Sequence, residues 1–375
     1  MRTRERALGR AIVVALPAWG LSRVVVVGTL LLARLTVSSV RPHNGAAAAR
    51  VHQGLLGWDA GWYQSIAAHG YAASGQQSLR FFPAFPMLAR GLAWIPGVGT
   101  GVAVVVVANL SALLGMAVLV VLVQRETGDA ELARRTVWLL ALAPAAYTLV
   151  LGYAEGTLLL CTTVAFVALR SRRWWWAAAA GLVAGAVRPI GLLLIVPALI
   201  EAWQARHDGR SAGQLGARLA AVVAPAVGTG AYLAWVGTNF GDAFLPFKLQ
   251  QQGGHRGPLA DPFATVGHNV AAVFHGHHLG SALHVPWVVL SVVLLVFVFR
   301  RLPLSYGAFT TVVLAVSLTS SNLDSFERYA LSAFPLVIVG SMWTSRRRVE
   351  QVVLVVAAVG MAAYAYLSFV NVVVP

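Results

Sequence analysis

Long apolar segments, separated by short polar ones, dominate the sequence. A helix needs about 20 apolar residues to cross a bilayer, and fewer where it is one half of a broken pair. The pattern predicts an all-α polytopic membrane protein with about 11 transmembrane helices, formed as a single domain over residues 1–375. The predicted spans lie at about 11–37, 98–123, 133–150, 154–170, 174–187, 190–204, 217–238, 285–300, 303–320, 329–344 and 350–371.

Two of these segments, 174–187 and 190–204, are short, and Arg188-Pro189 separates them. Non-helical backbone at membrane depth usually lines a cavity. Arg188 is therefore a candidate cavity residue, although it would also fit as one more loop arginine.

The polar connections differ in length, and the two long ones cover about 38–97 and 239–284. Within the first, near-helical spacing predicts an amphipathic helix around 47–70, with Leu55, Trp62, Ile66 and His69 on one face.

Charge changes the interpretation of these loops. The chain is 58% hydrophobic and 11% charged, with a formal net charge of +15. Its arginines gather at the ends of apolar segments, so they indicate membrane topology rather than nucleic-acid binding. If the N-terminus is cytoplasmic, every short basic connection falls inside and both long loops fall outside. We therefore expect a plasma-membrane protein that acts on the extracytoplasmic side, in contact with the bilayer and without a nucleic-acid partner.

The chemistry-bearing residues are few. The single cysteine, Cys161, excludes an internal disulfide and a cysteine cluster for a metal. Histidines gather in the second long loop, and a zinc site at His275-Gly276-His277-His278 is one reading of them. A solvated or acceptor-contacting loop is the other reading and the one we favour. The loop histidines are His255, His268, His275, His277, His278 and His284.

Acids at a membrane boundary are costly unless paired or hydrated, so each is a functional candidate. Asp59 stands out because it lies between aromatic residues just after the first span; alternatively it caps a helix that begins near Trp62. The acids in cytoplasmic loops, such as Glu126 and Glu201, are expected to be solvated partners of arginine. The acids expected on the outer side are Asp59, Glu155, Asp242, Asp261, Asp324 and Glu327.

Three further candidate site residues would also fit ordinary structural roles. Glu155 lies in the short outer connection 151–156 and would also fit as an ordinary loop acid. Glu327 and Arg328, between two spans, would also fit as partners of other charges.

Several motifs together resemble the PIG-V-like mannosyltransferases, which in eukaryotes add the second mannose during GPI-anchor assembly and which have bacterial relatives. They occur in order over about residues 58–336. Where the family often has YSES, this chain has YAEG and keeps the acid. The motifs are WDAGWY from Trp58, IAAHGY and FFPAFP after it, APAA from Ala143, YAEG from Tyr153, GAVRPIG from Gly185, and ERY from Glu327 with Phe334-Pro335.

The resemblance implies a GT-C glycosyltransferase that takes mannose from a polyprenyl-phosphate donor. A carboxylate in the first outer loop commonly acts as base in that class, and Asp59 is the matching position. The lipid phosphate leaves as a stable anion, so one carboxylate suffices for inverting transfer. The acceptor would be a membrane lipid, a glycan or a protein hydroxyl.

Guanidinium groups suit a phosphate best, and Arg188 and Arg328 are the expected donor phosphate ligands. They can neutralise a single phosphate, so no metal or other cofactor is expected. The residues expected to bind sugar or acceptor, or to orient the arginines, are Trp58, Trp62, Tyr63, Glu155 and Glu327.

Two other functions remain open. A transporter or flippase of lipid-linked sugars shares broken helices and buried charges, but it predicts two similar halves, and the sequence has no such repeat. A non-catalytic protein of cell-envelope assembly would not need acids and arginines clustered on one face.

Overall fold

The computed structural model describes residues 2–42, 44–208, 211–252, 255–274, 284–321 and 323–375. Within these ranges the chain is helical, and its only β-type pairing is one isolated bridge between Leu259 and Ser320. The predicted all-α membrane architecture therefore agrees with the structure. The count of about 11 spans stays a prediction. The helical segments that are long and apolar enough to cross a membrane are Ala7–Val40, Thr100–Thr127, Pro189–His207, Ala212–Phe240 and Arg347–Phe369.

The helices follow the apolar segments of the sequence closely, with short 3-10 turns at several of the breaks. The helices up to residue 204 are α1 (Arg2–Val40), α2 (Gly45–Gln53), α3 (Asp59–Ser74), α4 (Ala84–Leu92), α5 (Thr100–Thr127), α6 (Ala130–Leu142), α7 (Glu155–Arg170), α8 (Trp174–Val187) and α9 (Ile195–Gln204). The later ones are α10 (Ala212–Phe240), α11 (Leu245–Gln250), α12 (Pro262–Phe274), α14 (Val285–Arg301), α15 (Leu304–Leu318), α16 (Phe326–Ser332), α17 (Pro335–Met342) and α18 (Arg347–Phe369). The 3-10 turns are η1 (Gly54–Leu56), η2 (Gln76–Arg80), η3 (Pro144–Leu149), η4 (Pro189–Leu194) and η5 (Ala205–His207).

The prediction of one amphipathic helix around 47–70 is wrong. The backbone turns at Gly54, with φ 58°, and again at Trp58, with φ 57°, so α2 and α3 are separate helices. The predicted span 329–344 is also divided, because α16 ends at Ser332 and Pro335 begins α17.

Helix α7 shows how the charged groups are distributed. Glu155, its first residue, contacts Arg188 and Arg328, whereas Arg170, its last residue, pairs with Glu126 and Glu201. At 1.5 Å per residue, α7 separates these two groups by about 24 Å. The structure therefore collects the predicted outer and cytoplasmic charges at opposite ends of the bundle. Which end faces the cytoplasm stays a prediction.

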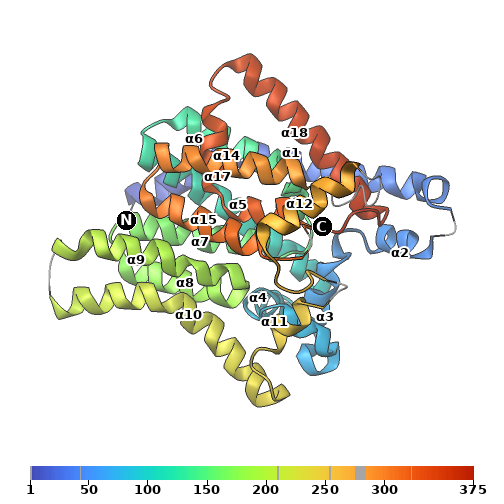
Figure 1. Ribbon diagram of the computed structural model, residues 1–375, viewed down its shortest axis with the longest axis horizontal. Helices are drawn as coiled ribbons and strands as arrows, with labels where there is room; N and C mark the ends of the chain where they lie inside the picture. The colour runs from blue at the N-terminus through green and yellow to red at the C-terminus, as the bar shows by residue number, and fades with distance from the viewer. Residues whose placement is uncertain (1, 43, 209–210, 253–254, 275–283, 322) are drawn as a thin grey trace.

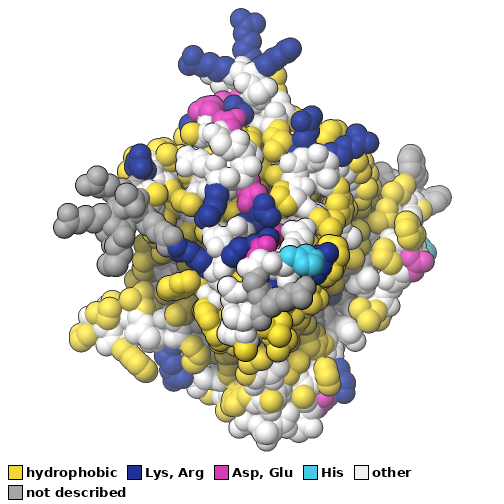
Figure 2. All heavy atoms as spheres, turned by 90° about the vertical axis from the view of Figure 1, so that its left-hand side faces the viewer, with side chains coloured by type: hydrophobic (Ala, Val, Ile, Leu, Met, Phe, Trp, Pro, Cys, Tyr) yellow, Lys and Arg dark blue, Asp and Glu magenta, His cyan; other side chains and the backbone are white. Residues whose placement is uncertain are grey.

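At the end of the bundle that carries Arg170, the acids are more buried than expected. Glu201 is only 1% exposed, and it accepts hydrogen bonds from Arg170, Arg172 and Ser305. Glu126 and Glu201 both pair with Arg170, as expected. The prediction that they are solvated is wrong, since their side chains are only 9% and 1% exposed. Figure 2, which looks at the left-hand side of Figure 1, shows basic and acidic side chains gathered in the middle of this face among hydrophobic ones.

Small residues allow α8 and α10 to pack closely, as Figure 1 shows for these neighbouring helices. A Cβ atom on Gly185 would lie 2.1 Å from the Pro225 carbonyl oxygen, and one on Gly228 would lie 2.0 Å from that of Leu182. Close backbone approach through glycine is typical of helix pairs in membranes. The contact fixes the end of α8, and therefore the position of Arg188 directly after it.

We predict that Gly228→Ala destabilises the protein by about 1–3 kcal/mol, because the added methyl group collides with backbone atoms that cannot move independently. The matched control is Gly230→Ala on the same helix, where the space around the Cβ position is open. The control should be neutral or slightly stabilising, since alanine favours helix more than glycine. Thermal unfolding of the purified protein in detergent measures both, and equal melting temperatures would contradict the packing argument.

Candidate active site

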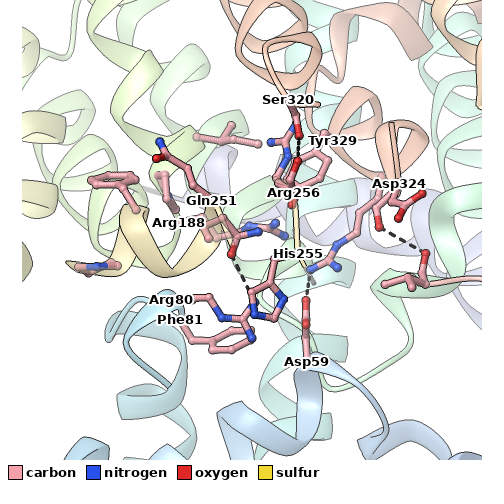
Figure 3. A pocket seen from close by; sticks show the side chains of 18 of the residues that line it. Asp59, Arg80, Phe81, Arg188, Gln251, His255, Arg256, Ser320, Asp324 and Tyr329 are labelled. Atoms are coloured by element: carbon pink, nitrogen blue, oxygen red, sulfur yellow. Dashed lines mark hydrogen bonds and ion pairs between the residues drawn. The ribbon is translucent and has the colours of Figure 1, made fainter. Parts of the chain in front are cut away.

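A cavity of about 590 Å³ lies at the end of the bundle where α7 begins, within the size range of small-molecule sites. Its walls come from five parts of the chain: the first long loop, the segment from Val187 into η4, the segment from α11 to residue 259, the region from α15 to α16, and the last residues, Val374 and Pro375. Figure 3 shows Asp59, Arg80, Arg188 and Arg256 extending toward the same space from different elements. The two loops predicted to be long and functional thus meet at one cavity.

Asp59 opens α3 and lines this cavity. Its Oδ2 accepts a hydrogen bond of 2.8 Å from Nη2 of Arg328, and its own N–H donates to the Tyr153 hydroxyl at 3.3 Å. The Asp59 side chain is nevertheless 30% exposed, so a substrate in the cavity can reach the carboxylate. The alternative in which Asp59 caps a helix near Trp62 is wrong, since Asp59 is itself helical and Trp58 occupies the N-cap position.

Glu155 joins the two arginines predicted to bind phosphate. Its Oε1 accepts hydrogen bonds from Nη1 of Arg188 and from Nε of Arg328. All three side chains are buried, with Glu155 only 5% exposed. Glu155 is thus not an ordinary loop acid, and it lies behind the cavity wall rather than in it. Together with Asp59, these residues form a group of two carboxylates and two guanidinium groups, which we call the Asp59 cluster.

The local sequence explains why Arg188 reaches this cluster. Proline disfavours helical conformation in the residue before it, and Arg188 has the extended φ and ψ values of −158° and 153°. Helix α8 therefore stops at Val187, and the predicted break between two short helices is confirmed. The Arg188 guanidinium also lies 5.5 Å from the ring centroid of Tyr329.

The aromatic residues of the WDAGWY and FFPAFP motifs pack against each other. Trp62 stacks on Phe81 with ring centroids 6.0 Å apart, and Tyr63 meets Phe81 edge-on at 5.1 Å. Trp58 is fixed by a hydrogen bond of 3.1 Å from its Nε1 to the Ser368 carbonyl. Trp58, Trp62 and Tyr63 all line the cavity, as expected of residues that would contact a sugar or an acceptor.

Glu327 is the predicted site residue that the structure places elsewhere. It is absent from the cavity wall, and its Oε2 bonds to Nδ1 of His284 at 2.7 Å. Burial lowers the pKa of His284, but the hydrogen bond to Glu327 and the charges of Glu327 and Asp324 outweigh it, so the pKa lies above its usual value. The predicted zinc-site histidines, His275, His277 and His278, lie outside the described residues. Among the residues that the structure describes, no group of three or more potential metal ligands occurs.

Sequence reasoning missed several residues of the cavity. Arg80 lines the cavity, but its sequence does not distinguish it from the other loop arginines. Its position directly before FFPAFP is the only feature that could have indicated a functional role. No sequence feature indicated that Arg256 lines the cavity, because its position depends on how the second long loop folds over the bundle. Tyr329 belongs to the ERY motif and was not singled out; its ring lies 4.4 Å from the Arg256 guanidinium.

This arrangement can bind an anionic group and accept a proton from a hydroxyl beside it. The arginines supply positive charge and directed donors, and Asp59 supplies a basic oxygen in contact with the cavity. Comparison of the sequence with protein-family models and with curated proteins gives no match. The function is therefore inferred from the cavity residues together with the motif resemblance.

We predict that Glu155→Gln destabilises the protein by about 3–5 kcal/mol, because it leaves two buried guanidinium groups with less compensating charge. Glu131→Gln is the matched control, since Glu131 pairs with Arg134 but its side chain is 57% exposed. The control should cost about 1 kcal/mol or less. Thermal unfolding in detergent distinguishes the two, and similar losses would show that Glu155 does not compensate the arginines.

The His284–Glu327 pair predicts a pH dependence of stability. A raised pKa in the folded state means that the stabilisation by protonated His284 is fully present below the unfolded value of 6.5 and is lost as the pH rises through the folded pKa. The difference in melting temperature between wild type and His284→Gln should therefore be largest at pH 6 and shrink at alkaline pH. A difference independent of pH would mean that the imidazole contributes only packing.

Proposed function

We propose that this protein is an inverting glycosyltransferase, which transfers a mannosyl residue from a polyprenyl-phosphate donor to a glycolipid, glycan or protein acceptor at the outer face of the membrane. One observation carries the proposal: an accessible carboxylate, Asp59, faces a cavity lined by arginines from both long loops. The identity of the sugar comes from the motif resemblance alone.

In the proposed reaction the acceptor hydroxyl oxygen attacks the anomeric carbon of the donor sugar while Asp59 takes the hydroxyl proton. The bond between the anomeric carbon and the phosphate oxygen breaks, and the lipid phosphate keeps the electron pair. Arg328 holds Oδ2 of Asp59 and so fixes the direction of the carboxylate. The positive charge around the cavity would stabilise the departing phosphate, so the proposal requires no metal ion.

A lipid substrate fits the apolar part of the cavity wall. Ile190, Phe247, Leu259 and Val316 line the cavity beside the arginines, and Leu259 is 74% exposed. An isoprenoid chain could lie along these residues while its phosphate stays near the guanidinium groups. A cavity for a soluble sugar nucleotide would not need this apolar wall.

We predict that Asp59→Asn lowers the transfer rate by about 100-fold or more, because asparagine cannot accept the proton. Purified protein is given a radiolabelled polyprenyl-phosphate mannose and membrane extract as acceptor source, and the labelled product is quantified. The control is Asp261→Asn, an exposed aspartate of the second long loop that does not line the cavity.

Near-full transfer by Asp59→Asn would rule out the base assignment. No transfer by the wild-type protein, together with movement of labelled lipid across reconstituted vesicles, would favour a transporter instead. Absence of both activities would favour a non-catalytic role in envelope assembly.

A further inference from the structure

The arginines of the cavity fall into two groups by charge compensation. Arg188 and Arg328 both contact Glu155, and Arg328 also contacts Asp59, so the Asp59 cluster balances two positive charges with two negative ones. Arg80 and Arg256 also line the cavity, but neither has a carboxylate partner among the described residues. An incoming anion would have to displace direct carboxylate contacts at the first pair. At the second pair no carboxylate that the structure describes is in direct contact, and Asp59 acts on Arg80 only from a longer distance.

Arg80 reaches the cavity from η2, in the first long loop. Its guanidinium lies 5.1 Å from the Phe81 ring, and its hydrogen bonds go to uncharged acceptors, the Gln77 carbonyl at 3.3 Å and Oε1 of Gln250 at 3.4 Å. Burial lowers the pKa of Arg80. The side chain is thus a half-buried cation whose long, neutral contacts leave it able to bind an anion more strongly.

Arg256 reaches the cavity from the second long loop. Its Nη2 donates to the Ser317 carbonyl at 2.5 Å, and its guanidinium lies over the Tyr329 ring at 4.4 Å. Its Nε is buried and has no hydrogen-bond acceptor in the described part of the chain. A buried guanidinium N–H without an acceptor is costly, and a turn of the side chain toward an anion in the cavity would remove that cost.

The net charge of the cavity lining also favours an anionic ligand. Its lining contains five arginines and two aspartates, so positive charge is in excess even after Glu155, behind the wall, is counted. The fifth arginine, Arg50, lies with its guanidinium 4.1 Å from the Trp58 ring. Excess positive charge facing a partly apolar cavity is favourable only with an anionic ligand, since burying uncompensated charge is costly.

We propose that Arg80 and Arg256 form an anion-binding site for the phosphate group of a lipid, while Arg188 and Arg328 position Asp59 and Glu155. The assignment of this lipid as a substrate rests on the proposed function. The anion-binding site itself stands independently of that function. The same chemistry fits the phosphate of the sugar donor and a phosphate carried by the acceptor.

A binding experiment tests the site without turnover. Full-length protein in nanodiscs of neutral phosphatidylcholine is titrated with citronellyl phosphate, a short isoprenyl phosphate, with citronellol, which lacks the phosphate, and with inorganic phosphate. Citronellyl phosphate should bind about tenfold or more tightly than citronellol, and salt should weaken it. Arg80→Gln and Arg256→Gln should each weaken its binding about tenfold.

The matched control is Arg90→Gln, because Arg90 lies in the same loop, on α4, and does not line the cavity. Arg80→Lys and Arg256→Lys keep the charge and should retain more affinity than the glutamine variants, which a purely structural role would not require. Equal binding of citronellol and its phosphate would overturn the proposal. So would wild-type affinity in both glutamine variants, or loss of phosphate binding in Arg188→Gln alone.

Steady-state transfer assays then separate the two sources of the phosphate. A rise in the KM for the donor in Arg80→Gln, with an unchanged KM for the acceptor, assigns the site to the donor; the reverse assigns it to the acceptor. Both results support the site. If the wild-type protein binds citronellyl phosphate through these arginines but transfers no sugar, the proposed function fails and the anion site stands.

Discussion

A single buried carboxylate holds together the end of the bundle where the cavity lies. Glu155 accepts hydrogen bonds from Arg188 and Arg328, which are 33 and 173 residues away in the chain, and Arg328 in turn holds Asp59. Each of these charges alone would be expensive to bury, and together they compensate one another. The helices that carry them are therefore fixed relative to each other at the point where the two long loops close over the cavity.

Much of this architecture follows from local features of the sequence. Apolar length predicts the helices, and the steric demand of Pro189 places a break at Arg188. Burial cost marks Asp59 and Glu155 as unusual acids, and the structure brings both together with the two predicted arginines. These predictions succeed because each depends on a segment of a few residues and on the properties of a bilayer.

The rest depends on tertiary contacts that no short segment encodes. The break between α2 and α3 needs positive φ at Gly54 and Trp58, and Trp58 is a residue that disfavours it. Glu327, one residue from Arg328, points in a different direction from the same short helix and pairs with His284 instead. Arg80 and Arg256 become neighbours of one cavity only because two distant loops fold over it.

Helix α7 carries ionic networks at both of its termini, with Glu155 at one and Arg170 at the other. A shift of one residue along its axis, about 1.5 Å, would disrupt both networks at once. The helix therefore acts as a fixed strut between the two ends of the bundle. Entry and release of a ligand would therefore involve the cavity segments around Trp58 and Arg256 rather than sliding of this helix.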